Sequence, residues 1–322
     1  MKKYLVTGGA GFIGSHLTDA LLAQGHSVLV LDDCSSGYLE NIYPDYRAAS
    51  SNKLIRDNLT FIKGSISDQT LVSKCLEGVS GCFHLAAHLG MAVCKEDWVG
   101  THLINLTATI TLFDAIQKNY QQSGNKIPVV YASSAAVYGD LGNKAFHEDL
   151  KVQPLSAYGA DKLGCELHAY VANAIYGIPS VGLRFFNVYG PRQRPDTIDS
   201  GVIPIFIDRI MKGLDLKVFG SGEQTRDFVH VRDVVQHCLF FMETMSDKAS
   251  VFNVCSGTAI RLNELITLLG QLSHQPLSIQ HRPERPGDVF YALGNPEKAK
   301  AMGITCQIPL EEGLEQLWET YQ

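Results

Sequence analysis

Short runs of β-branched and aromatic residues alternate with longer amphipathic segments through the first 185 residues of the chain. The runs predict buried strands at Tyr4–Thr7, Ser27–Leu31, Leu59–Ile62, Cys82–Ala86, Val129–Ala132 and Val181–Phe185. Between them, Phe12–Ala23 and Leu103–Ile116 place apolar residues on one helical face. Strands that alternate with helices form βαβ units, so the pattern predicts an α/β fold with a doubly wound parallel sheet.

The regular alternation ends near Asn187, where proline and glycine become denser. A domain commonly has about 150 residues, so a chain of 322 residues accommodates two. We therefore expect a first domain over residues 1–186 and a smaller mixed α/β lobe over residues 187–322.

Charge and cysteine content narrow the class of protein. The chain has 27 basic and 33 acidic side chains without a basic cluster, which argues against nucleic acid or an anionic membrane as a partner. The start of the chain lacks a signal-peptide pattern, and the longest apolar stretch is interrupted by His84 and His88. The eight cysteines form no C-x-x-C pair. These features predict a cytoplasmic protein with reduced thiols and no metal centre.

A glycine-rich turn, Gly8-Gly9-Ala10-Gly11-Phe12-Ile13-Gly14, joins the first predicted strand to the first predicted helix. Gly8 allows the turn, Gly11 allows close approach of a pyrophosphate, and Gly14 allows the helix to pack on the strand. The context of strand, turn and helix is that of a Rossmann dinucleotide site. It predicts cofactor contacts at Gly8, Gly11, Phe12, Ile13 and Gly14.

An acidic residue follows at the spacing that such a site requires. Asp32 ends the second strand 18 residues after Gly14, where a carboxylate accepts hydrogen bonds from a ribose 2′-hydroxyl. Asp33 and Cys34 come next, with no arginine to receive a 2′-phosphate. Two carboxylates repel that extra charge, so the sequence predicts NAD as the cofactor and not NADP.

A serine, a tyrosine and a lysine are the candidate catalytic residues. Tyr158 and Lys162 are four residues apart and share one helical face. Ser134 follows the strand at Val129–Ala132, and ligands of parallel sheets bind beyond the carboxyl ends of strands. A nearby ammonium and an oxidised nicotinamide both favour a phenolate, so Tyr158 can act as a general base.

Five segments in this order resemble the extended short-chain dehydrogenase/reductases that act on nucleotide sugars, and most nearly the UDP-hexose 4-epimerases. They are Thr7–Gly14, Phe83–Ala87, Ser133–Gly139, Tyr158–Lys162 and Leu183–Pro191. The resemblance implies that residues 1–186 bind NAD, that residues 187–322 bind the nucleotide sugar, and that the protein is a homodimer. Its dimer contacts would use the helix that carries Leu163, Leu167, Tyr170, Val171 and Ala174, although burial against the chain's own sheet explains the same residues.

The resemblance also implies roles for individual residues. Asn105 would organise an active-site water, and Asn187 would meet the substrate diphosphate. Arg226 and Arg285 would bind that diphosphate through charge-assisted hydrogen bonds, and Asp288 would meet the nucleoside ribose. Further cofactor contacts are implied at Ser65, Ile66, Leu85, Ala86 and Ala87.

The reaction implied is inversion at C4 of a UDP-hexose. Tyr158 would take the proton from O4, Ser134 would hydrogen-bond that oxygen, and Lys162 would hold the cofactor ribose. The dehydratases of this superfamily carry an Asp-Glu pair where this chain has Ala135-Ala136, and methyl groups cannot transfer protons. Ala292 matches a gate residue whose small size implies tolerance of a 2-acetamido group.

Other functions remain open at this point. Within enzymes they are a 2-epimerase, a uronate 4-epimerase, a 4-keto reductase or a dehydratase. From other classes they are a non-catalytic NAD-binding regulator and a metal hydrolase on His84 and His88, the latter opposed by the lack of an H-E-x-x-H pattern. The loop 88–95 and the segment Gly64-Ser65-Ile66 both depart from the pattern common in these epimerases.

Overall fold

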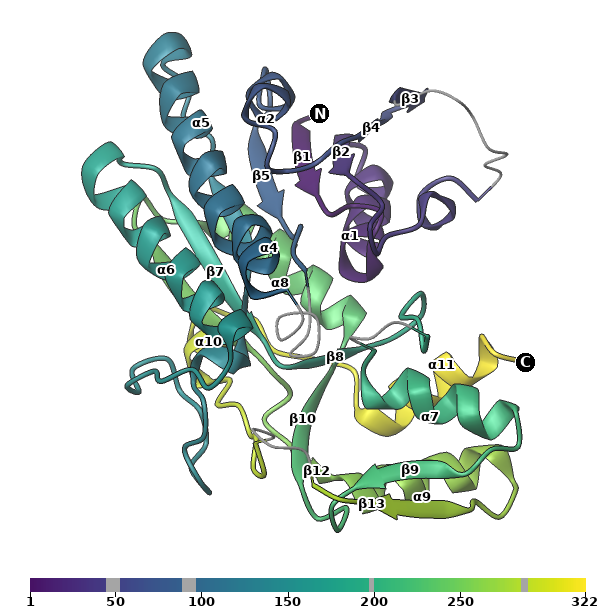
Figure 1. Ribbon diagram of the computed structural model, residues 1–322. Coiled ribbons are helices and arrows are strands. Elements are labelled where there is room, and N and C mark those ends of the chain that lie inside the picture. Colours follow the sequence, from purple (N-terminus) through teal and green to yellow (C-terminus); the bar gives the residue numbers. More distant parts are fainter. Residues whose placement is uncertain (45–52, 89–96, 197–199, 285–288) are drawn as a thin grey trace.

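An eight-stranded sheet forms the centre of the protein (Figure 1). The computed structural model describes residues 1–44, 53–88, 97–196, 200–284 and 289–322. The strands of the large sheet are β1 (Lys3–Thr7), β2 (Ser27–Asp32), β3 (Lys53–Arg56), β4 (Leu59–Lys63), β5 (Gly81–His84), β6 (Val129–Ser134), β7 (Ser180–Phe185) and β11 (Ser250–Val254). Their order across the sheet is β11-β7-β6-β5-β1-β2-β4-β3, and β3 alone among them runs antiparallel to its neighbour.

Both faces of this sheet are covered by helices. The helices α1 (Phe12–Ala23) and α8 (Val231–Thr244) lie on one face, and α2 (Gln69–Cys75), α5 (Ala108–Ser123) and α6 (Ala157–Tyr176) lie on the other (Figure 1). Successive residues of β1 therefore enter two different cores, Tyr4 and Val6 the first and Leu5 the second. Burial on both faces is why these strands are continuously apolar.

One helical segment of the second layer, residues 98–123, is long and apolar enough to cross a membrane by length and composition. It consists of α4 (Trp98–His102), the π-helical turn η2 (Leu103–Thr107) and α5. Thr101, Asn105, Leu112 and Ile116 on its inner side are buried, so it is a core helix of the α/β fold.

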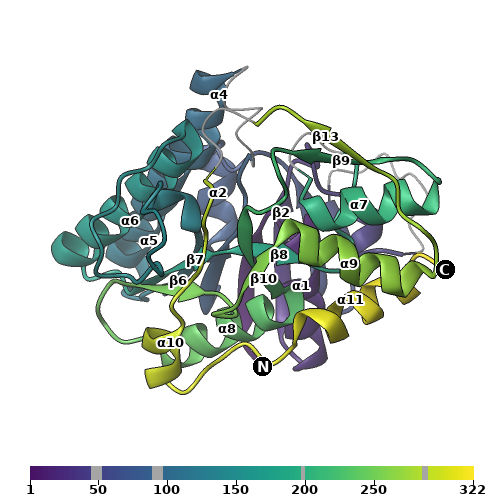
Figure 2. The same cartoon turned by 90° about the horizontal axis from the view of Figure 1, so that it is seen from below.

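A smaller lobe lies beyond the carboxyl ends of the central strands, and Figure 2 shows its helices on one side of the molecule. Its strands are β8 (Asn187–Tyr189), β9 (Leu216–Phe219), β10 (Thr225–His230), β12 (Ala259–Arg261) and β13 (Ile279–Arg282). They form a three-stranded sheet β12-β10-β8 and a parallel pair β13-β9. The helices α7 (Val202–Met211), α9 (Leu262–Ser273) and α11 (Leu310–Glu319) surround a separate core. Short helices lie at η1 (Leu39–Asn41), η3 (Ala135–Val137) and α10 (Glu297–Ala301).

The predicted fold class is confirmed: an α/β protein with a Rossmann-type sheet and a smaller mixed lobe. All six predicted strands are present, but the prediction missed two strands of the large sheet. The first is β3, an antiparallel edge strand with lysine and arginine at its ends. The second is β11, which pairs with β7 although 64 residues separate the end of one from the start of the other. The helix α8 and the strand β11 follow residue 187 and complete the large layer, and the domain division at that residue stays a prediction.

Candidate active site

A cleft of about 580 Å³ lies where the carboxyl ends of the central strands face the small lobe. Ligands of open α/β sheets bind at this edge. Most of the predicted site residues line the cleft: Gly8, Gly11, Phe12, Ile13, Gly14, Asp32, Ile66, Leu85, Ala86, Ala87, Ser134, Tyr158, Lys162, Asn187, Arg226 and Ala292. Ser65 and Asn105 lie outside this lining, and Arg285 and Asp288 lie outside the described residues.

The glycine turn requires glycine at two positions. Gly8 has a φ of +71°, and a Cβ there would lie 2.7 Å from the backbone nitrogen of Ala86. A Cβ on Gly14 would lie 2.1 Å from the carbonyl oxygen of Gly8. At its N-cap, Gly11, helix α1 receives no capping hydrogen bond from a side chain, so backbone amides of its first turn remain to bind an anion. The turn therefore fits the pyrophosphate of a dinucleotide.

Asp32 lies at the wall of the same cleft and is 8% exposed. Its Oδ2 accepts a hydrogen bond from the amide of Ala10 at 2.9 Å, and its Oδ1 accepts one from the amide of Cys34 at 2.8 Å. Burial raises the pKa of this carboxyl above its usual value, against the lowering effect of these amides. The carboxylate thus holds the turns after β1 and β2 together where the cofactor ribose is predicted.

The three candidate catalytic residues come together in the cleft. Ser134 ends β6, and its Oγ accepts a hydrogen bond from the amide of Ala136 at 3.1 Å. Tyr158 and Lys162 lie in the first turns of α6, whose N-cap is Ser156. The Nζ of Lys162 lies 5.8 Å from the centroid of the Tyr158 ring. It donates a hydrogen bond to the carbonyl of Ala132 at 2.9 Å, which fixes the ammonium against β6.

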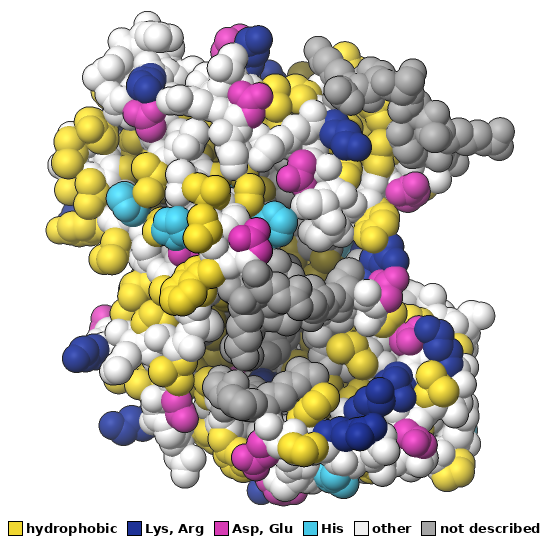
Figure 3. Space-filling view, viewed as in Figure 1, with side chains coloured by type: hydrophobic (Ala, Val, Ile, Leu, Met, Phe, Trp, Pro, Cys, Tyr) yellow, Lys and Arg dark blue, Asp and Glu magenta, His cyan; other side chains and the backbone are white. Residues whose placement is uncertain are grey.

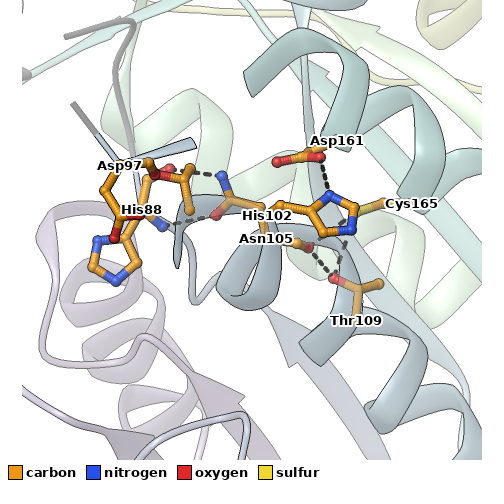
Figure 4. Close-up of polar contacts among 8 residues, drawn as sticks. His88, Asp97, His102, Asn105, Thr109, Asp161 and Cys165 are labelled. Carbon is orange, nitrogen blue, oxygen red and sulfur yellow. Dashed lines mark hydrogen bonds and ion pairs between the residues drawn. The ribbon is translucent and has the colours of Figure 1, made fainter. Parts of the chain in front are cut away.

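Asn105 is buried behind the cleft in the π-helical turn η2, and Figure 4 shows its contacts. Its Oδ1 accepts a hydrogen bond from the amide of His88 at 2.8 Å, and its Nδ2 donates one to the carbonyl of His88 at 3.0 Å. The backbone carbonyl of Asn105 accepts from the hydroxyl of Thr109 at 2.6 Å. The side chain therefore positions the backbone of His88 at the cleft wall, and its predicted role with a water stays a prediction.

The small lobe contributes the other wall. Asn187 donates from Nδ2 to the carbonyl of Asp227 at 3.1 Å, and Arg226 donates from a terminal guanidinium nitrogen to the carbonyl of Val289 at 2.8 Å. The amide of Ala292 lies 3.3 Å from the hydroxyl of Thr225. These contacts hold the predicted substrate residues on β8, β10 and the segment that follows residue 289.

Sequence reasoning missed residues that close the cleft from above the glycine turn. Arg192 and Arg194 line it, the guanidinium carbon of Arg194 lying 4.1 Å from the centroid of the Tyr38 ring. Arg192 also pairs with Asp19 on α1 at 2.7 Å. Their signal in the sequence was the basic run directly after Gly190-Pro191.

His84, considered above as a metal ligand, is buried between two hydroxyl groups. Its Nδ1 lies 2.7 Å from the Thr7 hydroxyl and its Nε2 lies 2.9 Å from the Thr109 hydroxyl. Burial lowers the pKa of His84 to about 3, so the imidazole is neutral at pH 7. Within the part of the chain that the structure describes, no group of three or more His, Cys, Asp or Glu side chains could hold a metal ion.

Comparison with known proteins gives the site its chemical context. The model of the NAD dependent epimerase/dehydratase family matches residues 4–255. The chain belongs to this family. It is a member of the NAD-dependent UDP-sugar 4-epimerases within that family, and its cofactor is NAD.

Three relatives illustrate the range of this family. The UDP-glucose 4-epimerase of Mycolicibacterium smegmatis is 33% identical, covering 99% of this chain and 98% of that protein. The UDP-N-acetylglucosamine 4-epimerase of Methanobrevibacter ruminantium, solved with UDP-N-acetylmuramic acid, has a TM-score of 0.90 and 32% identity over 99% of this chain and 98% of that one. The UDP-glucuronic acid 4-epimerase of Bacillus cereus, solved with UDP-glucuronic acid and NAD, has a TM-score of 0.87 and 29% identity over 98% of each chain.

Proposed function

We propose that this epimerase inverts C4 of a UDP-hexose, interconverting UDP-glucose with UDP-galactose or the corresponding N-acetylhexosamines. The observation that carries the proposal is the meeting of Ser134, Tyr158 and Lys162 in the cleft that the glycine turn also lines. A base, a hydroxyl donor and an ammonium are there brought to one place beside the site that fits a dinucleotide.

Each residue has one task in this proposal. Tyr158, as its phenolate, takes the proton from the sugar O4, and Ser134 hydrogen-bonds that oxygen while it becomes a carbonyl. Lys162 holds the cofactor ribose and favours the phenolate by its positive charge. When bound, NAD supplies the group that accepts the C4 hydride and later returns it. The 4-keto sugar turns within the cleft, and its O4 regains the proton from Tyr158 as its other face is reduced.

The sugar preference is proposed from two sets of small side chains. Ala135 and Ala136 line the cleft beside Ser134 and carry no proton-transfer group, which disfavours loss of water across C5 and C6. Ala292 also lines the cleft, and its methyl group leaves room for a 2-acetamido substituent. The arginines of the cleft, Arg192, Arg194 and Arg226, suit the two charges of a diphosphate.

We also propose that the enzyme is a cytoplasmic homodimer. The helices α4 and α6 expose large apolar side chains, and Figure 3 shows hydrophobic groups gathered over this part of the molecule. Leu167 and Tyr170 are 59% and 66% exposed, so burial against the chain's own sheet does not account for them. Trp98 and Val99 on α4 continue the apolar face, and a second copy would cover all four side chains.

The direct test is product analysis. The purified protein is incubated separately with UDP-glucose, UDP-N-acetylglucosamine and UDP-glucuronate, without added NADH, and the epimers are resolved by chromatography. We expect conversion of UDP-glucose, UDP-N-acetylglucosamine or both. Turnover of UDP-glucuronate alone would instead identify a uronate 4-epimerase, and stoichiometric consumption of NADH would identify a reductase.

A further inference from the structure

We propose that Asp161 is a positioning residue that keeps the buried Lys162 in its ammonium form, and that His102 holds the Asp161 carboxylate in place for this task. The inference rests on the proposed function, since it assigns the counter-charge of the proposed catalytic lysine. Neither Asp161 nor His102 belongs to the glycine turn or to the serine, tyrosine and lysine set.

The geometry of the pair is shown in Figure 4. Asp161 directly precedes Lys162 on α6 and is 4% exposed. Its Oδ1 lies 2.8 Å from Nδ1 of His102, the last residue of α4. A carboxylate only accepts, so the imidazole donates from Nδ1. The second oxygen, Oδ2, is buried and has no hydrogen-bond partner among the described residues, so most of the carboxylate charge is left uncompensated.

Lys162 needs such a counter-charge. Its side chain is buried, and burial lowers the pKa of its ammonium, whereas Cys165 and Asp161 act to raise it. Cys165 cannot supply a negative charge at neutral pH, because burial raises the pKa of its thiol. Asp161 is therefore the anion that opposes the loss of the proton from Lys162.

The other groups around Lys162 carry no compensating negative charge. From β5, the neutral imidazole of His84 faces it, and from β6 the carbonyl of Ala132 accepts its hydrogen bond. From α6 itself, the Tyr158 ring lies 5.8 Å away. Removal of the Asp161 charge alone would thus favour the neutral amine, which neither stabilises a phenolate nor donates fully to a ribose.

The test is the alkaline limb of the pH profile. Asp161→Asn has the same shape and keeps an oxygen that accepts from His102, but it removes the charge. We expect the alkaline limb of kcat/KM for the UDP-hexose that the wild type epimerises to move about one pH unit lower. We expect the same displacement in the pH at which NAD affinity is lost, measured by calorimetry without a sugar substrate. An unmoved limb together with unmoved NAD affinity would overturn the proposal.

A matched control is Asp114→Asn. Asp114 pairs with Lys118 at 2.6 Å on the outer side of α5, so this variant loses the same charge beside a lysine that is exposed. We expect its pH profile to coincide with that of the wild type. A displacement equal to that of Asp161→Asn would show a general charge effect and contradict the assignment.

Variants of His102 test the pair independently, including the case in which Asp161→Asn fails to fold. The His102 side chain is 44% exposed, so its replacement by alanine removes the donor and admits water, which screens the carboxylate. We expect a smaller displacement in the same direction for His102→Ala and its reversal in His102→Asn, whose amide donates from nearly the same place. Identical profiles for His102→Ala and wild type would overturn the role of His102. If the wild type epimerised no UDP-hexose, the proposed function would fail, while the NAD measurements would still decide the role of Asp161.

Discussion

Glu166 and Arg184 form a bidentate ion pair inside the core, directly behind the candidate catalytic serine. The Nε of Arg184 donates to Oε1 of Glu166 at 2.8 Å, and one terminal nitrogen donates to Oε2 at 2.7 Å. The hydroxyl of Ser133 donates to the same Oε1 at 2.5 Å. The pair therefore joins α6, β6 and β7 at the residue that precedes Ser134, so the position of the catalytic hydroxyl depends on a charge contact that no substrate touches.

This contact predicts a large effect of Glu166→Gln on stability. The two side chains of the pair are 7% and 5% exposed, so the variant leaves the Arg184 charge buried without a counter-ion. We expect the free energy of unfolding to fall by about 3 to 5 kcal/mol, measured by urea titration. Asp114→Asn breaks a surface pair instead and is expected to cost less than about 1 kcal/mol. Equal losses for the two variants would contradict the argument.

Tyr158→Phe is expected to abolish most of the turnover. The variant keeps the ring that lines the cleft but has no oxygen to take the proton, so kcat should fall by about 10²- to 10⁴-fold. The NAD content of the purified protein should remain that of the wild type. Tyr170→Phe, an exposed tyrosine on the same helix, is the matched control and should retain full activity. Wild-type turnover in Tyr158→Phe would refute the assignment of the base.

Buried histidines predict a loss of stability on acidification. Burial lowers the pKa of His230 to about 4, below the value of 6.5 for an exposed imidazole. Between these values the unfolded chain binds the proton and the folded chain does not, so stability is present above pH 6.5 and is lost as the pH falls toward 4. At pH 5 this amounts to roughly 2 kcal/mol for one such histidine.

The variant His230→Asn isolates this effect. The Nδ1 of His230 accepts from the amide of Arg232 at the start of α8, and an asparagine oxygen can cap the helix in the same way. The variant should lose less stability than the wild type when Tm is compared at pH 7 and pH 5. An identical decrease in Tm for both proteins would show that His230 does not carry the acid sensitivity.

The proposed dimer predicts that a charge on the apolar face of α6 separates the subunits. Tyr170→Glu places a carboxylate where a second copy would bury it, so light scattering should report a monomer at concentrations at which the wild type is a dimer. Ile55→Glu introduces the same charge at a side chain that is also 66% exposed but lies on β3. This control should not alter the mass. A monomeric wild type would contradict the proposal directly.

The predictable parts of this enzyme are those in which the signal is local. The glycine turn, Asp32 and the Tyr158–Lys162 pair lie within short spacings whose geometry a strand, a turn or a helix determines. All of these residues meet in one cleft.

The missed features depend on partners that are distant in the chain. His102 and Asp161 are 59 residues apart, and neither residue type signals its partner in the sequence. The same reason explains β11, whose hydrophobic run carries no sign of which sheet it joins. Positions 285 and 288 lie outside the described residues, so their predicted contacts with the nucleotide stay predictions.

The placement of β11 at the outer edge of the large sheet has a consequence for biosynthesis. Until residues 250–254 have left the ribosome, β7 is an unpaired border of a nearly finished nucleotide-binding layer, with its amides and carbonyls open to other nascent chains. The N-terminal half therefore cannot mature on its own during translation. Its protection from aggregation depends on a strand that is synthesised after most of the small lobe's first elements, so release of a truncated chain yields an adhesive fragment and not an independent cofactor-binding module.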